Sequence, residues 1–332
     1  MGPGVFRWGV LVPHGVNQEF AGWEPAAAWQ RMVEVGRLAE SLGYDQLWVQ
    51  DCVDTQPRRS PELVFDSWIA ATALAGATTR ARIGAAVPCA PYHHPGTLAK
   101  RAATLDVASG GRAVLELGTG SHPCGYESYG WQVPSPSERL AILGEQIEVL
   151  DQLWREPSVT HTGEHWRLRD AHCAPTPLRS ALPVRLPAAR LEGDVELAAR
   201  WADQVVWQGS PAEVTAARAR LREACAQVGR DPSDITEAVR IECRIFADNV
   251  ERDRWLGSPF VIAFWSAHPD NYCERNLVGT VGSVVRQVQR YVDAGITEMV
   301  VSFRDYPETT SLEAFRTEVV PLVTPAVETT PA

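Results

Sequence analysis

The stretch Val114-Leu-Glu-Leu-Gly-Thr-Gly-Ser-His-Pro123 passes from apolar residues into two closely spaced glycines. The apolar run predicts a strand that is buried on both faces, and the glycines mark its end. A dinucleotide-binding turn would need a third glycine and an immediate helix, but Pro123 follows and no helical pattern starts before about Ser137. The fold therefore depends on how often a strand of this kind recurs.

The same unit recurs along the whole chain. Apolar runs predict eight strands: Val5–Pro13, Tyr44–Asp51, Ala81–Pro88, Arg112–Gly120, Val184–Ala188, Asp203–Gln208, one within Thr236–Ala247, and Glu298–Phe303. Amphipathic patterns predict the helices Ala26–Leu42, Phe65–Ala77, Pro95–Ala108, Ser137–Trp154, Val195–Trp201, Pro211–Val228, Val281–Ala294 and Leu312–Val323. Eight strand–helix units favour an α/β (β/α)8 TIM barrel over its competitor, a doubly wound sheet.

Two segments interrupt this alternation within what is otherwise predicted as one domain over residues 1–332. The first, Val159–Arg169, is predicted to form a small β-hairpin around Gly163. The second is an insertion over residues 248–278 that is rich in aromatic residues, namely Trp255, Phe260, Phe264, Trp265 and Tyr272. It is interpreted either as a lid over the barrel mouth or a dimer contact, or as a satellite hydrophobic cluster beneath a loop.

Composition narrows the class of protein. The net charge of −10 argues against nucleic acid and anionic membranes as partners. The seven cysteines form no C-x-x-C pair, and no apolar run approaches the roughly 20 residues of a membrane helix. No secretory leader pattern opens the chain. We therefore expect a cytoplasmic protein with reduced cysteines that acts on a small molecule.

In a barrel, functional side chains gather where the strands end. That rule selects His14, Asp51, Cys52, Ala86, Val87, Cys89, the run Gly118-Thr119-Gly120-Ser121-His122, Arg190, Gln208, Arg304 and Asp305. No histidine spacing predicts a metal site, and His93-His94 before Pro95 are interpreted as a helix cap. A hydrolytic triad is also disfavoured, because the G-x-S-x-G elbow is missing.

Longer blocks carry a resemblance. Residues 94–120, HPGTLAKRAATLDVASGGRAVLELGTG, resemble the bacterial luciferase-like monooxygenase family, as do residues 163–169, 198–203 and 291–301. The resemblance implies a barrel with an insertion, usually dimeric, that binds coenzyme F420 or FMN at its C-terminal mouth. The Leu-Asp-x-x-Ser-Gly-Gly-Arg turn and the Gly-Thr-Gly end look most like the F420-dependent branch.

The resemblance also implies places for the cofactor. The ring would lie against the end of the third strand, where the family often has a cis peptide that maps to Ala86–Val87, and Asp51 matches an acidic cofactor contact. The residues predicted to bind cofactor are Asp51, Ala86, Val87, Gly118, Thr119, Gly120, Ser121 and Arg190. His14 and His122 are the expected proton donors, and Cys52 stands where the dehydrogenases often have a catalytic histidine.

Three departures qualify these expectations. Cys52 replaces that histidine, and Ser121 stands where the sugar-phosphate dehydrogenases have a glutamate. The glycine-rich loop that normally holds the cofactor phosphate reads LPAARLEGDVE over residues 186–196. The primary expectation is an F420- or FMN-dependent oxidoreductase for a small apolar substrate. The alternatives are a barrel repurposed for non-redox chemistry or metabolite binding without a cofactor, and an inactive dimer subunit.

Overall fold

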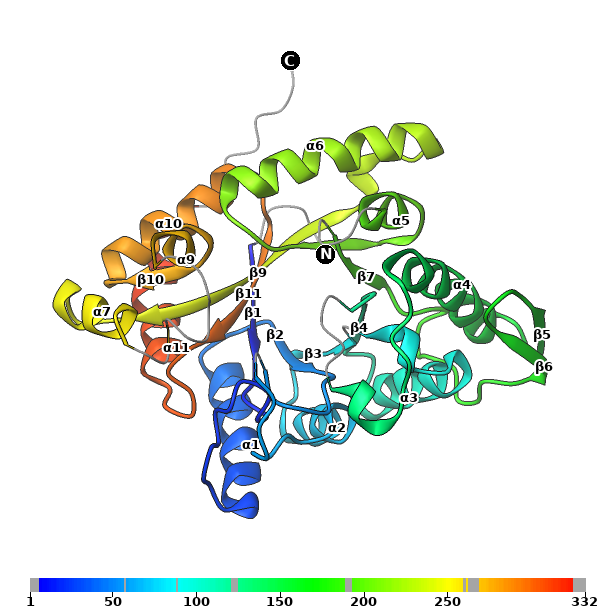
Figure 1. Cartoon of the computed structure of the whole chain (residues 1–332), viewed down its shortest axis with the longest axis horizontal. Helices are drawn as coiled ribbons and strands as arrows, with labels where there is room; N and C mark the ends of the chain where they lie inside the picture. Colours follow the sequence, from blue (N-terminus) through cyan, green and yellow to red (C-terminus); the bar gives the residue numbers. More distant parts are fainter. Residues whose placement is uncertain are drawn as a thin grey trace.

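The computed structural model describes residues 6–56, 58–87, 89–120, 125–188, 193–258, 261 and 269–324. Eight parallel strands form a closed barrel: β1 (Arg7–Leu11), β2 (Gln46–Gln50), β3 (Arg82–Val87), β4 (Ala113–Leu117), β7 (Val184–Pro187), β8 (Gln204–Trp207), β9 (Thr236–Ile245) and β11 (Glu298–Phe303). The pairing of β8 with β9 completes the ring (Figure 1). The predicted barrel is confirmed, and the doubly wound alternative is wrong.

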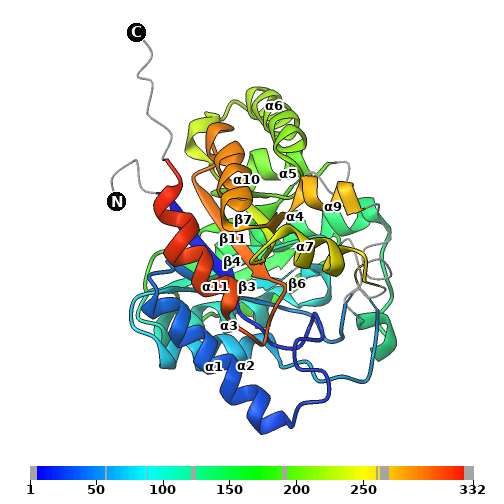
Figure 2. The same cartoon turned by 90° about the vertical axis from the view of Figure 1, so that its left-hand side faces the viewer.

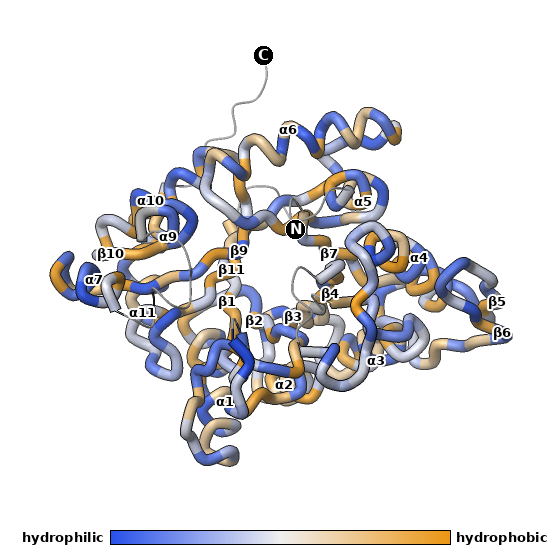
Figure 3. Tube along the Cα trace, viewed as in Figure 1, coloured by the Kyte–Doolittle hydropathy of each residue, from blue (hydrophilic) through white to orange (hydrophobic). Residues whose placement is uncertain are grey.

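Helices surround the strands on the outside. They are α1 (Pro25–Ser41), α2 (Ser67–Ala77), α3 (Pro95–Ala108), α4 (Pro136–Arg155), α5 (Asp194–Trp201), α6 (Pro211–Val228), α10 (Val281–Asp293) and α11 (Thr310–Ala314). Three of these helices end at glycines: Gly43, Gly229 and Gly295 each have a positive φ within two residues of a helix end. Figure 3 shows hydrophobic residues concentrated on the strands and on the inner faces of these helices.

The predicted last helix differs from the observed one. The α-helical part ends at Ala314, and the chain continues as a π-helical turn over Phe315–Val319 and a 3-10 turn over Val320–Leu322. Pro321 in that turn lacks the backbone N–H that an α-helix needs there. Figure 2 shows α11 beside α1, so this segment lies next to the first helix of the ring.

The two predicted interruptions are both present. The hairpin consists of β5 (Val159–Thr162) and β6 (Arg167–Ala171), which pair antiparallel at the outer edge of α4. The insertion contains α7 (Asn249–Leu256), α9 (Pro269–Arg275) and a short strand β10 (Leu277–Gly279). Sequence reasoning missed β10, which adds to β9 as a ninth parallel strand outside the ring.

Part of the insertion forms a hydrophobic cluster separate from the main core. Phe246, Leu256, Tyr272 and Val278 make up the cluster, with Trp255 and Cys273 packed against it. These contacts match the satellite-cluster interpretation for Trp255 and Tyr272. Phe260, Phe264 and Trp265 lie outside the described residues, and a lid or dimer role for the insertion stays a prediction.

Charged side chains occupy the lower half of the barrel interior, which is the half away from the mouth. Arg185 of β7 donates to Glu116 of β4 at 3.1 Å and to Glu298 of β11. Glu298 also accepts from Gln46 Nε2 at 2.8 Å, and the Arg185 guanidinium carbon lies 4.4 Å from the centroid of the Trp48 ring. Burial opposes ionisation, yet the Arg185 guanidinium lowers the pKa of Glu298, so the carboxylate stays charged. This network closes the bottom of the barrel and leaves its mouth as the place for a ligand.

Candidate active site at the barrel mouth

The end of β2 places a buried ion pair at the mouth. Asp51 follows β2, is 5% exposed, and its backbone N–H donates to the Ala86 carbonyl of β3 at 2.7 Å. The His93 ring nitrogen Nε2 lies 3.0 Å from Asp51 Oδ2, and the Tyr126 hydroxyl lies 3.1 Å from the same nitrogen. His93 is therefore shared between a carboxylate and a phenol.

The Asp51 carboxylate is held in its charged form. Burial alone would raise its pKa, but contact with His93, aided by the nearby Ser67 and Trp68 side chains, lowers the pKa below the usual value of 3.8. Despite the short contact with His93, Asp51 Oδ2 has no hydrogen bond of good geometry among the described residues. The imidazole and the carboxylate are in close contact, and the oxygen retains acceptor capacity for a further donor.

His14, a predicted proton donor, is engaged by the backbone. Its Nε2 lies 2.7 Å from the Gln50 carbonyl oxygen and its Nδ1 lies 3.2 Å from the Val12 carbonyl oxygen. The residue is 2% exposed. With each ring nitrogen at a carbonyl, His14 is placed to hold β1 and β2 together at their ends.

Cys52, another predicted catalytic residue, lies in a small hydrophobic cluster. The cluster contains Val16, Cys52, Cys89, Tyr92 and Tyr126. The Gln50 side-chain amide nitrogen lies 3.3 Å from the Cys52 sulfur. Cys52 as a whole is 3% exposed. The Tyr92 and Tyr126 rings stack with centroids 4.7 Å apart. This arrangement gives the mouth an aromatic wall beside Asp51.

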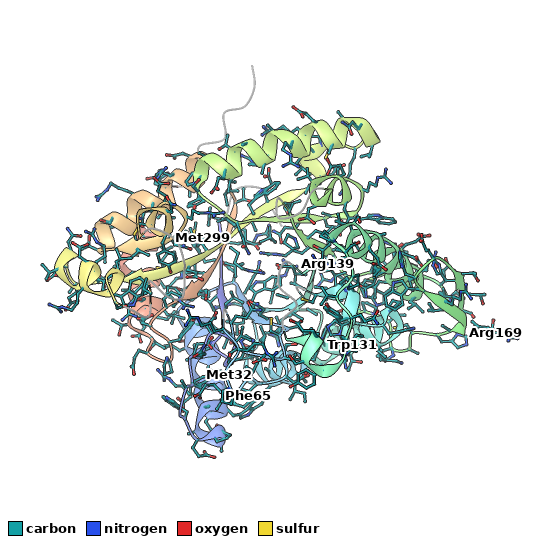
Figure 4. All side chains as sticks on the ribbon, viewed as in Figure 1. Met32, Phe65, Trp131, Arg139, Arg169 and Met299 are labelled. Carbon is teal, nitrogen blue, oxygen red and sulfur yellow. The ribbon has the colours of Figure 1, made fainter. Side chains whose placement is uncertain are left out.

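The glycine-rich end of β4 meets the end of β3. Thr119 forms an isolated bridge with Cys89, and the Ala90 N–H donates to the Gly118 carbonyl at 2.9 Å. Gly120, with a φ of 76°, presents its carbonyl to the buried Arg139 of α4. In Figure 4 Arg139 lies on the side of α4 that faces the barrel, whereas Arg169 lies far out on the hairpin. The structure thus brings Asp51, Ala86 and the Gly118–Gly120 run to one side of the mouth.

Several predicted site residues cannot be placed with this group. Ser121, His122 and Arg190 lie outside the described residues, and only the strand backbone of Val87 is described, so the cis peptide at Ala86–Val87 stays a prediction. Of the predicted phosphate loop, the residue directly before α5 is Gly193. It has a φ of 95°, and no side chain caps the helix there. Asp194 and Glu196 occupy the first turn.

The sequence interpretation missed three side chains at the mouth. His94 is the expected cap, since its Nδ1 accepts from the Gly96 N–H at 3.1 Å, but His93 beside it is the partner of Asp51. Arg139 and Tyr126 also reach the site from segments outside the strands. The apolar setting of His93, between Tyr92 and a helix start, was the available signal. The described residues contain no His, Cys, Asp or Glu group that could hold a metal ion.

Comparison with known proteins agrees with this architecture. The model of a family described as luciferase-like monooxygenase matches residues 7–271. An F420-dependent glucose-6-phosphate dehydrogenase of Kineococcus radiotolerans is 28% identical, with 89% of this chain and 93% of the relative aligned. An F420-dependent hydroxymycolic acid dehydrogenase of Mycobacterium tuberculosis is 25% identical over 88% of this chain and 84% of the relative.

Solved structures share the fold at lower identity. An F420-dependent secondary alcohol dehydrogenase in complex with an F420-acetone adduct superposes with a TM-score of 0.82 at 20% identity, covering 96% of this chain and 99% of the other. The long-chain alkane monooxygenase LadA gives a TM-score of 0.75 at 18% identity, covering 97% and 91%. At such identities the likeness concerns the fold. None of the described helices has both the length and the apolar sequence to cross a membrane.

Proposed function

The chain belongs to the luciferase-like monooxygenase family, and from this we propose that it is an oxidoreductase that uses coenzyme F420. The reaction moves a hydride, or two electrons, between F420 and a small, apolar organic molecule at the barrel mouth. FMN is the alternative cofactor. The F420-dependent relatives in two dehydrogenase groups support this choice.

The observation that carries the proposal is the Asp51 carboxylate. It is buried, charged, and retains an oxygen without a well-formed hydrogen bond at the end of β2. A ring N–H of a bound deazaflavin or flavin is a donor of the kind that such an oxygen accepts. Ala86 and the small residues Gly118 and Gly120 let a flat ring approach the backbone beside it. The residues present therefore fit the cofactor ring.

The aromatic wall supports an apolar substrate. Tyr92 and Tyr126 stack face to face, and the Trp131 ring meets both edge-on with centroids 5.7 and 6.2 Å away. Trp131 is 48% exposed at the outer edge of this wall, whereas Tyr92 and Tyr126 are buried. When bound, F420 supplies two-electron chemistry, while Asp51 orients the ring and the aromatic side chains exclude water from it.

A binding titration tests the proposal. F420, and separately FMN, should lose fluorescence on addition of the protein, with saturation in the micromolar range. Asp51→Asn should weaken binding by a factor of about 10 to 150, because a charged acceptor contributes roughly 1.5–3 kcal/mol. Asp231→Asn, a change in an exposed turn, should bind as the unmodified chain does. Failure of both cofactors to bind at tens of micromolar would refute the proposal.

One observation favours a second function. The first turn of α5 carries Asp194 and Glu196, and Asp194 is 5% exposed. Carboxylates there compete with a phosphate for the helix N-terminus by about 0.5–1 kcal/mol each. The alternative is a barrel that binds a metabolite or performs non-redox chemistry without a cofactor. A thermal-shift screen in which organic acids stabilise the protein and flavins do not would support it.

We further propose a cytoplasmic homodimer: the scattered cysteines favour the cytoplasm, and the family resemblance implies the dimer. A groove between α2 and α3 is lined by Trp68, Ile69, Lys100, Arg101 and Leu105, and Ile69 is 64% exposed. An exposed apolar side chain in such a groove suits contact with a second copy. Sedimentation velocity should show a dimer for the unmodified chain and a monomer for Ile69→Glu; a monomer in both would contradict the proposal.

A further inference from the structure

Glu242 lies on the inner wall of the barrel near the mouth. On β9, Arg240 donates to both carboxylate oxygens of Glu116 at 2.6 Å. Glu116 belongs to β4, which is not a neighbour of β9, so this contact crosses the barrel interior. Side chains two residues apart on a strand share a face. Glu242 therefore also faces inward, one step nearer the mouth than Arg240.

Two side chains from other elements converge on the Glu242 carboxyl. The Tyr272 hydroxyl of α9 donates to Glu242 Oε2 at 2.6 Å, and Arg304 Nε, directly after β11, lies 3.6 Å from the same oxygen. The Glu242 side chain is 21% exposed, whereas Arg304 is 6% exposed. The carboxyl group is thus largely enclosed, and Tyr272 fixes its position.

The charge balance around Glu242 differs from that around Asp51. Burial raises the pKa of Glu242, and the Arg304 charge and the Tyr272 hydrogen bond only partly oppose that effect. The same surroundings raise the pKa of Tyr272 well above 10, so the phenol stays protonated and remains a donor. Cys243 is buried next to Glu242 in the chain, and Arg244 lies over the Trp255 ring at 5.1 Å.

The position of β9 in the ring decides what Glu242 faces. Counted in either direction around the eight-stranded barrel, β9 is four strands from β3. The proposed cofactor ring lies against the ends of β3 and β4, beside Ala86 and Gly118. A substrate that stacks on that ring lies between the ring and the opposite wall, where Glu242 presents its carboxyl.

We propose that Glu242 is the group that gives a proton to the substrate or takes one from it, and that Tyr272 and Arg304 position its carboxyl. The inference rests on the proposed function and narrows the substrate to an apolar carbonyl or its alcohol. In carbonyl reduction the C=O π bond breaks, a C–H bond forms with the hydride that reduced F420 would supply, and an O–H bond forms with the Glu242 proton. Glu242 ends as a carboxylate, oxidised F420 would release its ring N–H proton to solvent, and solvent reprotonates Glu242; alcohol oxidation reverses each transfer.

Infrared difference spectroscopy on the whole protein tests this assignment with F420 as the probe. The unmodified chain should show the C=O band of a protonated carboxyl. As the pH is raised, this band should disappear only above the ordinary pKa range of glutamate. Glu242→Gln should lack this band. The control Glu237→Gln should keep it, because it removes a different carboxylate of β9, one that pairs with Arg218 of α6. Tyr272→Phe should move the midpoint, the pH at which half of the band is lost, to a higher value, because the carboxylate loses a hydrogen-bond donor.

Saturating F420 should raise the midpoint of the same band further, because the bound ring excludes water from the mouth. Fluorescence measures F420 binding in parallel, so each outcome has one meaning. If F420 binds and the midpoint does not move, or if Glu242→Gln keeps the band, the role of Glu242 is wrong and the proposed function stands. If F420 and FMN fail to bind, the proposed function fails and this role fails with it.

Discussion

The two halves of the barrel interior use charge differently. In the lower half, Arg185 reaches carboxylates on two other strands, and Glu298 accepts from Arg185, Gln46 and Gln204. At the mouth, Asp51 has one close imidazole and an oxygen with spare acceptor capacity, and Glu242 keeps part of its surface exposed. Dense mutual pairing stabilises the fold, whereas incomplete pairing leaves groups that a ligand can engage.

The largest effect is expected in the lower half. Arg185→Met leaves Glu116 and Glu298 buried with fewer partners, and removal of one member of a buried ion pair typically destabilises by about 3–5 kcal/mol. Urea unfolding should show a loss of that size. A loss below about 1 kcal/mol would mean that the lower network does not differ from the mouth in the way described.

A smaller effect is expected at the mouth. His93→Gln removes the imidazole beside Asp51 but keeps a side chain able to donate, so we expect a loss of about 1–3 kcal/mol in unfolding free energy. Cofactor affinity should fall along with stability, because the same carboxylate serves both. Unchanged affinity for F420 in this variant would mean that Asp51 does not contribute to cofactor binding.

The pH dependence should have opposite signs at the two sides of the mouth. Asp51 has a lowered pKa, so the stability it contributes is full above its unfolded value, near 3.8, and is lost as the pH falls through its folded value. Glu242 has a raised pKa, so its contribution is full below its unfolded value, near 4.5, and is lost as the pH rises through its folded value.

Thermal unfolding of matched variants between pH 3 and 8 checks these signs. Relative to the unmodified chain, Asp51→Asn should lose least at acid pH, and Glu242→Gln should gain as the pH rises. Curves that run parallel to the unmodified chain would show that neither group changes its pKa on folding.

The smallest effect is expected outside the barrel. Arg155 pairs with Asp151 one helical turn away, and their side chains are 53% and 45% exposed. Solvent screens such pairs, so Arg155→Ala should leave the free energy of unfolding almost unchanged. Urea unfolding beside Arg185→Met gives the contrast between an exposed and a buried arginine.

Periodicity predicted the barrel because most strands are nearly continuous apolar runs and the long helices each have one apolar face. Contacts between side chains far apart in the chain leave no such pattern in the sequence. Nothing near His93 in the sequence points to Asp51, more than forty residues earlier, and Tyr272 meets Glu242 only because α9 packs beside β9. β10 was missed because three residues are too few to show a period. Local chemistry was therefore predictable, and contacts between distant segments were not.

The ninth strand has a consequence for how this protein can change. Because β10 pairs with β9 and α7 and α9 share one hydrophobic cluster, both ends of the intervening segment are fastened to the same barrel wall. That cluster is separate from the main core, which packs the strands of the ring against the outer helices. Substitutions that loosen α7 or α9 should therefore leave the eight-stranded ring closed.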